Sequence, residues 1–87
     1  MQYGIGIEYR NNGDLEKALE FFQGVYRRFP DYIPSYYHFA QTLERHGRGE
    51  DASRIYREGI IIADKAGDAH AVSELQQALD LLQSESG

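Results

Sequence analysis

The side chains that could perform catalysis or bind a metal are dispersed along this sequence. The histidines are His38, His46 and His70, and none has a second histidine or a carboxylate at a metal-binding spacing such as H-E-x-x-H. The chain has no cysteine, which excludes thiolate metal sites and disulfides. No serine lies in a G-x-S-x-G motif, and the glycines of YGIGIE lack the third glycine of a dinucleotide fingerprint. We therefore predict no enzymatic activity, no cofactor and no metal.

The charge pattern disfavours nucleic acid as a partner. The formal net charge is −5, with acids and bases nearly balanced up to residue 63 and an acidic segment from Asp64 onward. A nucleic-acid contact needs a positive field, and the negative chain conflicts with one. A local basic patch is the exception, and we expect it to be a solvated helix surface with ion pairs. Its members are Arg45, Arg48, Arg54 and Arg57.

The elements that must position any site are helices. Apolar residues recur every three and four positions, and no segment alternates as a strand would. The expected helices cover residues 2–11, 14–29, 34–46, 49–65 and 68–83. Gly13, Gly47 and Gly67 can end helices in a left-handed conformation, and Asp14 and Asp68 can cap the next ones. Because the connections are short, consecutive helices should be antiparallel neighbours in an all-α fold.

Length and hydropathy indicate one small domain over residues 1–87. No apolar run approaches the about 20 residues that a membrane-spanning helix needs. The N-terminus has neither a basic start nor a long apolar stretch, so it does not resemble a secretory signal. We expect a cytoplasmic protein.

The chain repeats itself at a period of 34 residues. This shift aligns Tyr3 with Tyr37, Gly13 with Gly47, Glu16 with Glu50 and Ala18 with Ala52. The first unit reads Ile5-Gly6, Tyr9, Ala18, Phe22 and Pro30, and the second reads Tyr36, Phe39-Ala40, Leu43, Ala52 and Tyr56. The period and these residues resemble the tetratricopeptide repeat (TPR) family. The resemblance implies a right-handed helical repeat of two antiparallel helix pairs, over residues 1–32 and 33–66. A C-terminal capping helix (68–83) and a disordered tail (84–87) should follow.

One departure from the repeat predicts the register of the last helix. Asp64 stands where the second unit would carry its closing proline, so that helix should continue to Gly67. The last helix is then displaced by two residues, and Val72, Leu75 and Leu79 should face inward. Its other face is polar, as a capping helix requires. That face carries Ser73, Gln77, Asp80 and Ser84.

The TPR resemblance also implies a binding surface, because the first helix of each TPR unit lines a concave groove that holds a peptide or a partner helix. By matching position, the groove residues here are Tyr3, Ile7, Arg10 and Asn11, followed by Tyr37, Gln41, Glu44 and Arg45, with His38 at the rim. This aromatic, mixed-charge groove suits a protein or peptide with apolar anchors, with Tyr3 and Tyr37 as the strongest candidates. Some TPR domains clamp the C-terminal carboxylate of heat-shock chaperones with lysine and asparagine. Tyr3, Ile7, His38 and Gln41 stand in those places, so the resemblance does not extend to that clamp.

The stretch RRFPDYIPSYYHFAQ, residues 27–41, is dense in aromatic side chains but divides by position. Phe29 and Pro30 should close the first unit, while Tyr36 and Phe39 should pack inward. Of these aromatic residues, only Tyr37 is expected to face the groove, with His38 beside it, and the place of Tyr32 is left open.

Self-assembly is the alternative function. The first helix is apolar on more than one side, through Tyr3, Ile5, Ile7 and Tyr9. Repeat stacks usually need about three units or caps to bury their core. Either residues before Met1 would supply the missing cover, or a homodimer that covers the first helix and the groove would satisfy that need.

Overall fold

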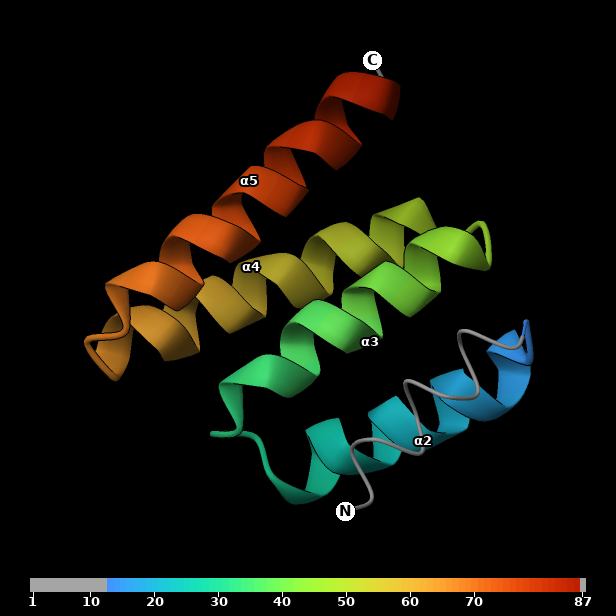
Figure 1. The fold of residues 1–87 in the computed structure, drawn as a ribbon, viewed down its shortest axis with the longest axis horizontal. Helices are drawn as coiled ribbons and strands as arrows, with labels where there is room; N and C mark the ends of the chain where they lie inside the picture. The colour runs from blue at the N-terminus through green and yellow to red at the C-terminus, as the bar shows by residue number, and fades with distance from the viewer. Residues whose placement is uncertain (1–12, 87) are drawn as a thin grey trace.

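The computed structural model describes residues 13–86, and within that range the chain folds into helices without a β-strand. The helices are α2 (Leu15–Arg28), α3 (Ile33–Arg45), α4 (Gly49–Lys65) and α5 (Ala69–Ser86). Each runs antiparallel to the next and packs beside it (Figure 1). The predicted all-α fold of antiparallel helices is therefore confirmed for the described residues. The helix expected over residues 2–11 lies outside the described residues.

The helix ends follow the predicted glycine and aspartate chemistry. Gly47 and Gly67 have φ values of 78° and 73°. After Gly47, the Arg48 N–H donates to the Leu43 carbonyl at 2.9 Å, and the Gly47 N–H donates to the Glu44 carbonyl at 3.0 Å. This is a Schellman motif, and it satisfies carbonyls that the helix end leaves without partners.

The second glycine joint has the same hydrogen bonds. The Asp68 N–H donates to the Ala63 carbonyl at 2.9 Å, and the Gly67 N–H donates to the Asp64 carbonyl at 3.0 Å. Asp68 then caps α5, since its Oδ1 accepts from the Ala71 N–H at 3.0 Å. Asp14 caps α2 more loosely, accepting from the Lys17 N–H at 3.4 Å.

The core alternates small and large side chains between the helices. Ala18, Ala40 and Ala52 are completely buried, as are the large rings of Phe22 and Tyr56. Small residues let neighbouring helices approach closely, and the rings fill the space beside them. These are the positions at which the repeat pattern predicted small and aromatic residues.

The last helix has the register that the missing proline predicted. Leu75 and Leu79 are buried, Val72 is half-buried, and Ala71 is buried as well, which we did not predict. The polar face of Ser73, Gln77, Asp80 and Ser84 is exposed. The helix continues to Ser86, so residues 84–86 are helical where we expected a disordered tail.

The aromatic-rich stretch of residues 27–41 divides as predicted. Tyr36 and Phe39 are buried, and the Tyr36 hydroxyl donates to the Pro30 carbonyl. Phe29, by contrast, is 56% exposed. It is the C-cap residue of α2, with a φ of −131°. The helix therefore ends where we predicted that Phe29 and Pro30 close the first unit, and the Phe29 side chain is not part of the core.

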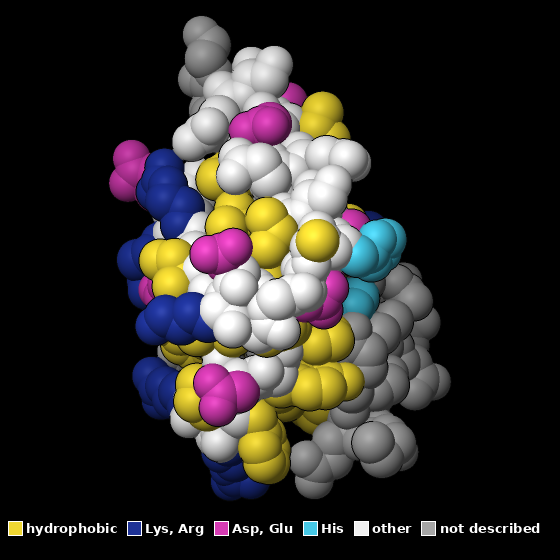
Figure 2. Space-filling model, turned by 90° about the vertical axis from the view of Figure 1, so that its left-hand side faces the viewer, with side chains coloured by type: hydrophobic (Ala, Val, Ile, Leu, Met, Phe, Trp, Pro, Cys, Tyr) yellow, Lys and Arg dark blue, Asp and Glu magenta, His cyan; other side chains and the backbone are white. Residues whose placement is uncertain are grey.

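Polar contacts on the surface join two helices and pair charged side chains along α4. The Tyr26 hydroxyl of α2 donates to Glu58 Oε1 of α4 at 2.5 Å, which links two helices that are not consecutive in the chain. Arg48, the N-cap residue of α4, pairs with Asp51 at 2.7 Å, and within α4 Arg54 pairs with Glu58 at 3.2 Å. Figure 2 shows Lys and Arg side chains in a row along one side of the molecule. The ion pairs agree with a solvated helix surface.

None of the described helices combines the length and the apolar character that crossing a bilayer requires.

Candidate functional site

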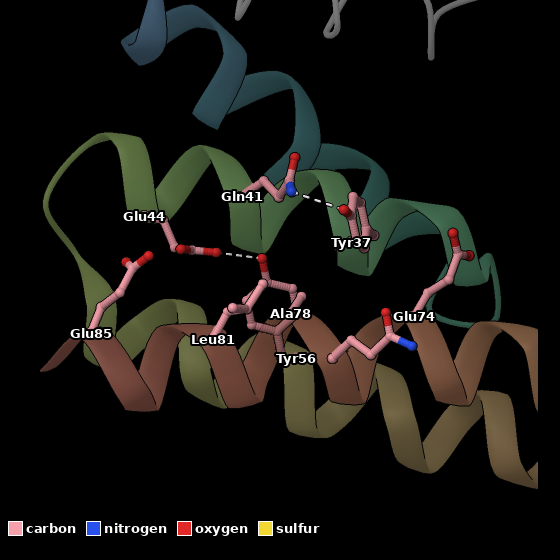
Figure 3. Close-up of a pocket in the computed structure, with 9 residues that line it drawn as sticks. Tyr37, Gln41, Glu44, Tyr56, Glu74, Ala78, Leu81 and Glu85 are labelled. Atoms are coloured by element: carbon pink, nitrogen blue, oxygen red, sulfur yellow. Dashed lines mark hydrogen bonds between the residues drawn. The ribbon is translucent and has the colours of Figure 1, made fainter. Parts of the chain in front are cut away.

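Two adjoining cavities lie between α3 and α5, and together we call them the groove. The first has a volume of about 250 Å³. Figure 3 shows side chains from both helices around it, with Tyr56 of α4 between them. Its lining residues are Tyr37, Gln41, Glu44, Tyr56, Glu74, Gln77, Ala78, Leu81 and Glu85.

The α3 wall of the first cavity is ordered by hydrogen bonds. Tyr37, Gln41 and Glu44 are spaced by four and three residues, which places them on one face of the helix. Gln41 Nε2 donates to the Tyr37 hydroxyl oxygen at 2.9 Å. The hydroxyl of the buried Tyr56 donates to Glu44 Oε2 at 2.5 Å. These bonds hold the side chains of the wall in place before any partner arrives.

The α5 wall was missed by the sequence reasoning. Glu74, Ala78, Leu81 and Glu85 recur at intervals of four, three and four, so they share one face of α5. Leu81 is 65% exposed. The sequence did contain one indication of this second face of α5: Leu81 falls outside the inward stripe of Val72, Leu75 and Leu79.

The second cavity, of about 510 Å³, adjoins the first and shares Tyr37 and Glu74 with it. His38 and His70 both line it, together with Asp68. The His38 ring stacks on the ring of Phe22, with centroids 5.8 Å apart. Within residues 13–86, no group of three or more His, Asp or Glu side chains could hold a metal ion.

The predicted groove residues have three outcomes. Tyr37, His38, Gln41 and Glu44 line the groove. Arg45 is exposed in the last turn of α3 and lines neither cavity. The rest lie outside the described residues: Tyr3, Ile7, Arg10 and Asn11.

The groove is suited to noncovalent recognition. It offers an exposed aliphatic side chain, a tyrosine ring, amides that can donate and accept, and several carboxylates. No Lys or Arg is among the residues that line its two cavities. Such a surface can bury an apolar side chain and attract a cation.

Comparisons with known proteins agree with this architecture. The model of the tetratricopeptide repeat family matches residues 9–79. The chain is 35% identical over 60 residues to an uncharacterized protein of Methanocaldococcus jannaschii, covering 69% of this chain and 70% of that protein.

Solved structures with the same fold include a tetratricopeptide repeat domain protein from Salinibacter ruber. It matches with a TM-score of 0.89 and 32% identity, over 94% of this chain and 83% of that one. A protein of Bordetella parapertussis matches with a TM-score of 0.86 and 25% identity, over 97% of this chain and 73% of that one. The chain therefore belongs to the tetratricopeptide repeat family.

Proposed function

We propose that this protein binds a segment of another protein, without catalysis, in the groove between α3 and α5. Members of the family generally mediate protein–protein interaction. The observation that carries the proposal for this chain is Leu81, which is 65% exposed at the edge of a cavity that Tyr37 also lines.

The exposed Leu81 side chain would contribute favourable free energy if a partner buried it. Burying a leucine side chain completely is worth about 1.5–3 kcal/mol. Tyr37 adds an aromatic ring with a polar end, the kind of residue that often dominates binding energy. Its hydroxyl already accepts a hydrogen bond from Gln41, so little side-chain freedom remains to be lost on binding.

The proposed surface includes positions that lie outside the described residues. Tyr3, Ile7, Arg10 and Asn11 would form its further part, with Tyr3 as a second anchor. Self-association rests mainly on the helix expected over residues 2–11, so it stays a prediction.

The test uses a random 12-residue peptide library displayed on phage, selected on the immobilised protein. A selected peptide is then titrated into ¹⁵N-labelled protein. We expect amide shifts at Tyr37, Gln41, Ala78 and Leu81. Shifts confined to α2 and to the face of α4 that carries Arg54 would contradict the groove.

A matched pair of variants sharpens the test. Leu81 and Ile61 are both exposed aliphatic residues, at 65% and 55%, but Ile61 lines neither cavity of the groove. Leu81→Ala should raise the dissociation constant of the selected peptide by about ten-fold, because most of the apolar surface that the leucine buries in the complex is lost. Ile61→Ala should leave the dissociation constant unchanged. Equal effects of the two substitutions would refute the groove.

A further inference from the structure

We infer that the segment bound in the groove carries lysine or arginine side chains beside its apolar anchor. This inference rests on the proposed function and specifies the chemistry of the partner. It follows from the charges that line the first cavity and from their arrangement around Leu81.

The first cavity is lined by three carboxylates on two helices. Glu44 comes from α3, and Glu74 and Glu85 come from α5. The same cavity is lined by no Lys, Arg or His. In the close-up, Glu44 and Glu85 lie toward one end of the cavity and Glu74 toward the other, with Leu81 between them (Figure 3).

This arrangement favours a cation over an anion or a neutral side chain. Screening at physiological ionic strength acts over about 8 Å. Glu44 and Glu85 lie toward the same end of the cavity and can act together on a charge placed there. Glu74 is 11 residues from Glu85 along α5, about 16 Å, so it acts on a second charge at the other end. A partner that carried acidic side chains would meet repulsion at both ends of the cavity, and this repulsion gives selectivity as well as affinity.

The carboxylates are also accessible to a partner. The Glu74 side chain is 57% exposed, with its Oε1 3.5 Å from His70 Nε2, which leaves Oε2 for a partner. Glu85 is exposed as well. Glu44 is half-buried and held by the Tyr56 hydroxyl, so it presents a fixed carboxylate. An incoming guanidinium or ammonium group can thus pair with either helix while an adjacent apolar side chain covers Leu81.

The experiment compares the composition of peptides selected from the random library on three proteins. The first is the unaltered chain. The second carries Glu74→Gln and Glu85→Gln, which removes two groove carboxylates. The third carries Glu16→Gln and Glu20→Gln on α2, two exposed carboxylates that line neither cavity. The two double variants have the same net charge, so a general attraction of basic peptides to an acidic protein affects both equally.

We expect Lys and Arg to be enriched in peptides selected on the unaltered chain and on the Glu16/Glu20 variant. The enrichment should disappear on the Glu74/Glu85 variant. For one selected basic peptide, the loss of both groove carboxylates should weaken binding by about ten-fold, at two- to five-fold for each ion pair. Added salt should weaken binding to the unaltered chain more than binding to the Glu74/Glu85 variant.

Each other outcome overturns a specific statement. Groove-bound peptides without a Lys or Arg excess would refute the basic partner and leave the proposed function standing. Failure to enrich any peptide would overturn both. A dimer in sedimentation that Leu81→Ala abolishes would assign the groove to a second copy of this chain and refute the inference.

Discussion

Gly59, in the middle of α4, allows the closest approach between helices among the described glycines. A Cβ atom built at this position would lie 2.7 Å from Tyr36 Cβ, 3.0 Å from Tyr36 Cγ and 3.2 Å from Leu75 Cδ1. The Tyr36 Cβ is bonded to the α3 backbone, so no rotamer change can move it away. Gly59→Ala should therefore force α3 and α4 apart.

The expected magnitude is the difference between two opposing effects. Overpacking a core costs about 1–3 kcal/mol, and a contact as short as 2.7 Å belongs in the upper half of that range. Alanine is favoured over glycine inside a helix by about 1 kcal/mol. The net loss in the free energy of unfolding should be about 1–2 kcal/mol, which lowers Tm by about 5–15 °C in a domain of this size.

Gly24, in α2, is the matched control. A Cβ atom there meets no described atom within 4 Å, so Gly24→Ala gains helix propensity without a clash. It should raise the free energy of unfolding by about 0.5–1 kcal/mol. Thermal and urea unfolding followed by circular dichroism measure both variants. If the two substitutions change stability in the same direction, the close-approach argument is wrong.

Three further predictions concern single residues. The hydrogen bond to the Glu58 carboxylate, and then partial burial, raise the pKa of Tyr26 above its usual 10.0. Because the folded pKa is the higher one, this bond stabilises fully below about pH 10 and is lost as the pH rises through the folded value. Tyr26→Phe should therefore cost about 1 kcal/mol at pH 7 and flatten the decline in unfolding free energy above pH 10. Asp68→Ala should cost about 1 kcal/mol by removing the cap on the Ala71 N–H, whereas Asp68→Asn should cost much less. Gly67→Ala should cost about 1–2 kcal/mol, because φ is 73° there.

The same unfolding measurements can refute each of these three predictions. An unfolding free energy that declines equally above pH 10 with and without Tyr26→Phe would refute the role of that hydroxyl. Equal losses for Asp68→Ala and Asp68→Asn would show that the cap contributes nothing. A Gly67→Ala variant as stable as the unaltered chain would mean that the left-handed conformation is not required there.

The sequence by itself determined the fold class, the joints and the register of α5. Each of these depends on local rules: helical periodicity, glycine and aspartate at helix ends, and a 34-residue repeat of small and aromatic residues. The loss of a proline at Asp64 was enough to predict which face of α5 would be buried. Phe29 ends α2 as predicted, but the exposure of its side chain does not follow from periodicity, because the backbone leaves the helical conformation at that residue.

Only the tertiary structure decided the α5 wall of the groove. Leu81, Glu74 and Glu85 belong to a helix that sequence reasoning treated as a cap, and their proximity to Tyr37 depends on how α5 packs against α3 and α4. The contact between Gly59 and Tyr36 likewise joins residues from two helices. Periodicity reports which face of a helix is apolar, but the distance and angle between helices determine which side chains meet.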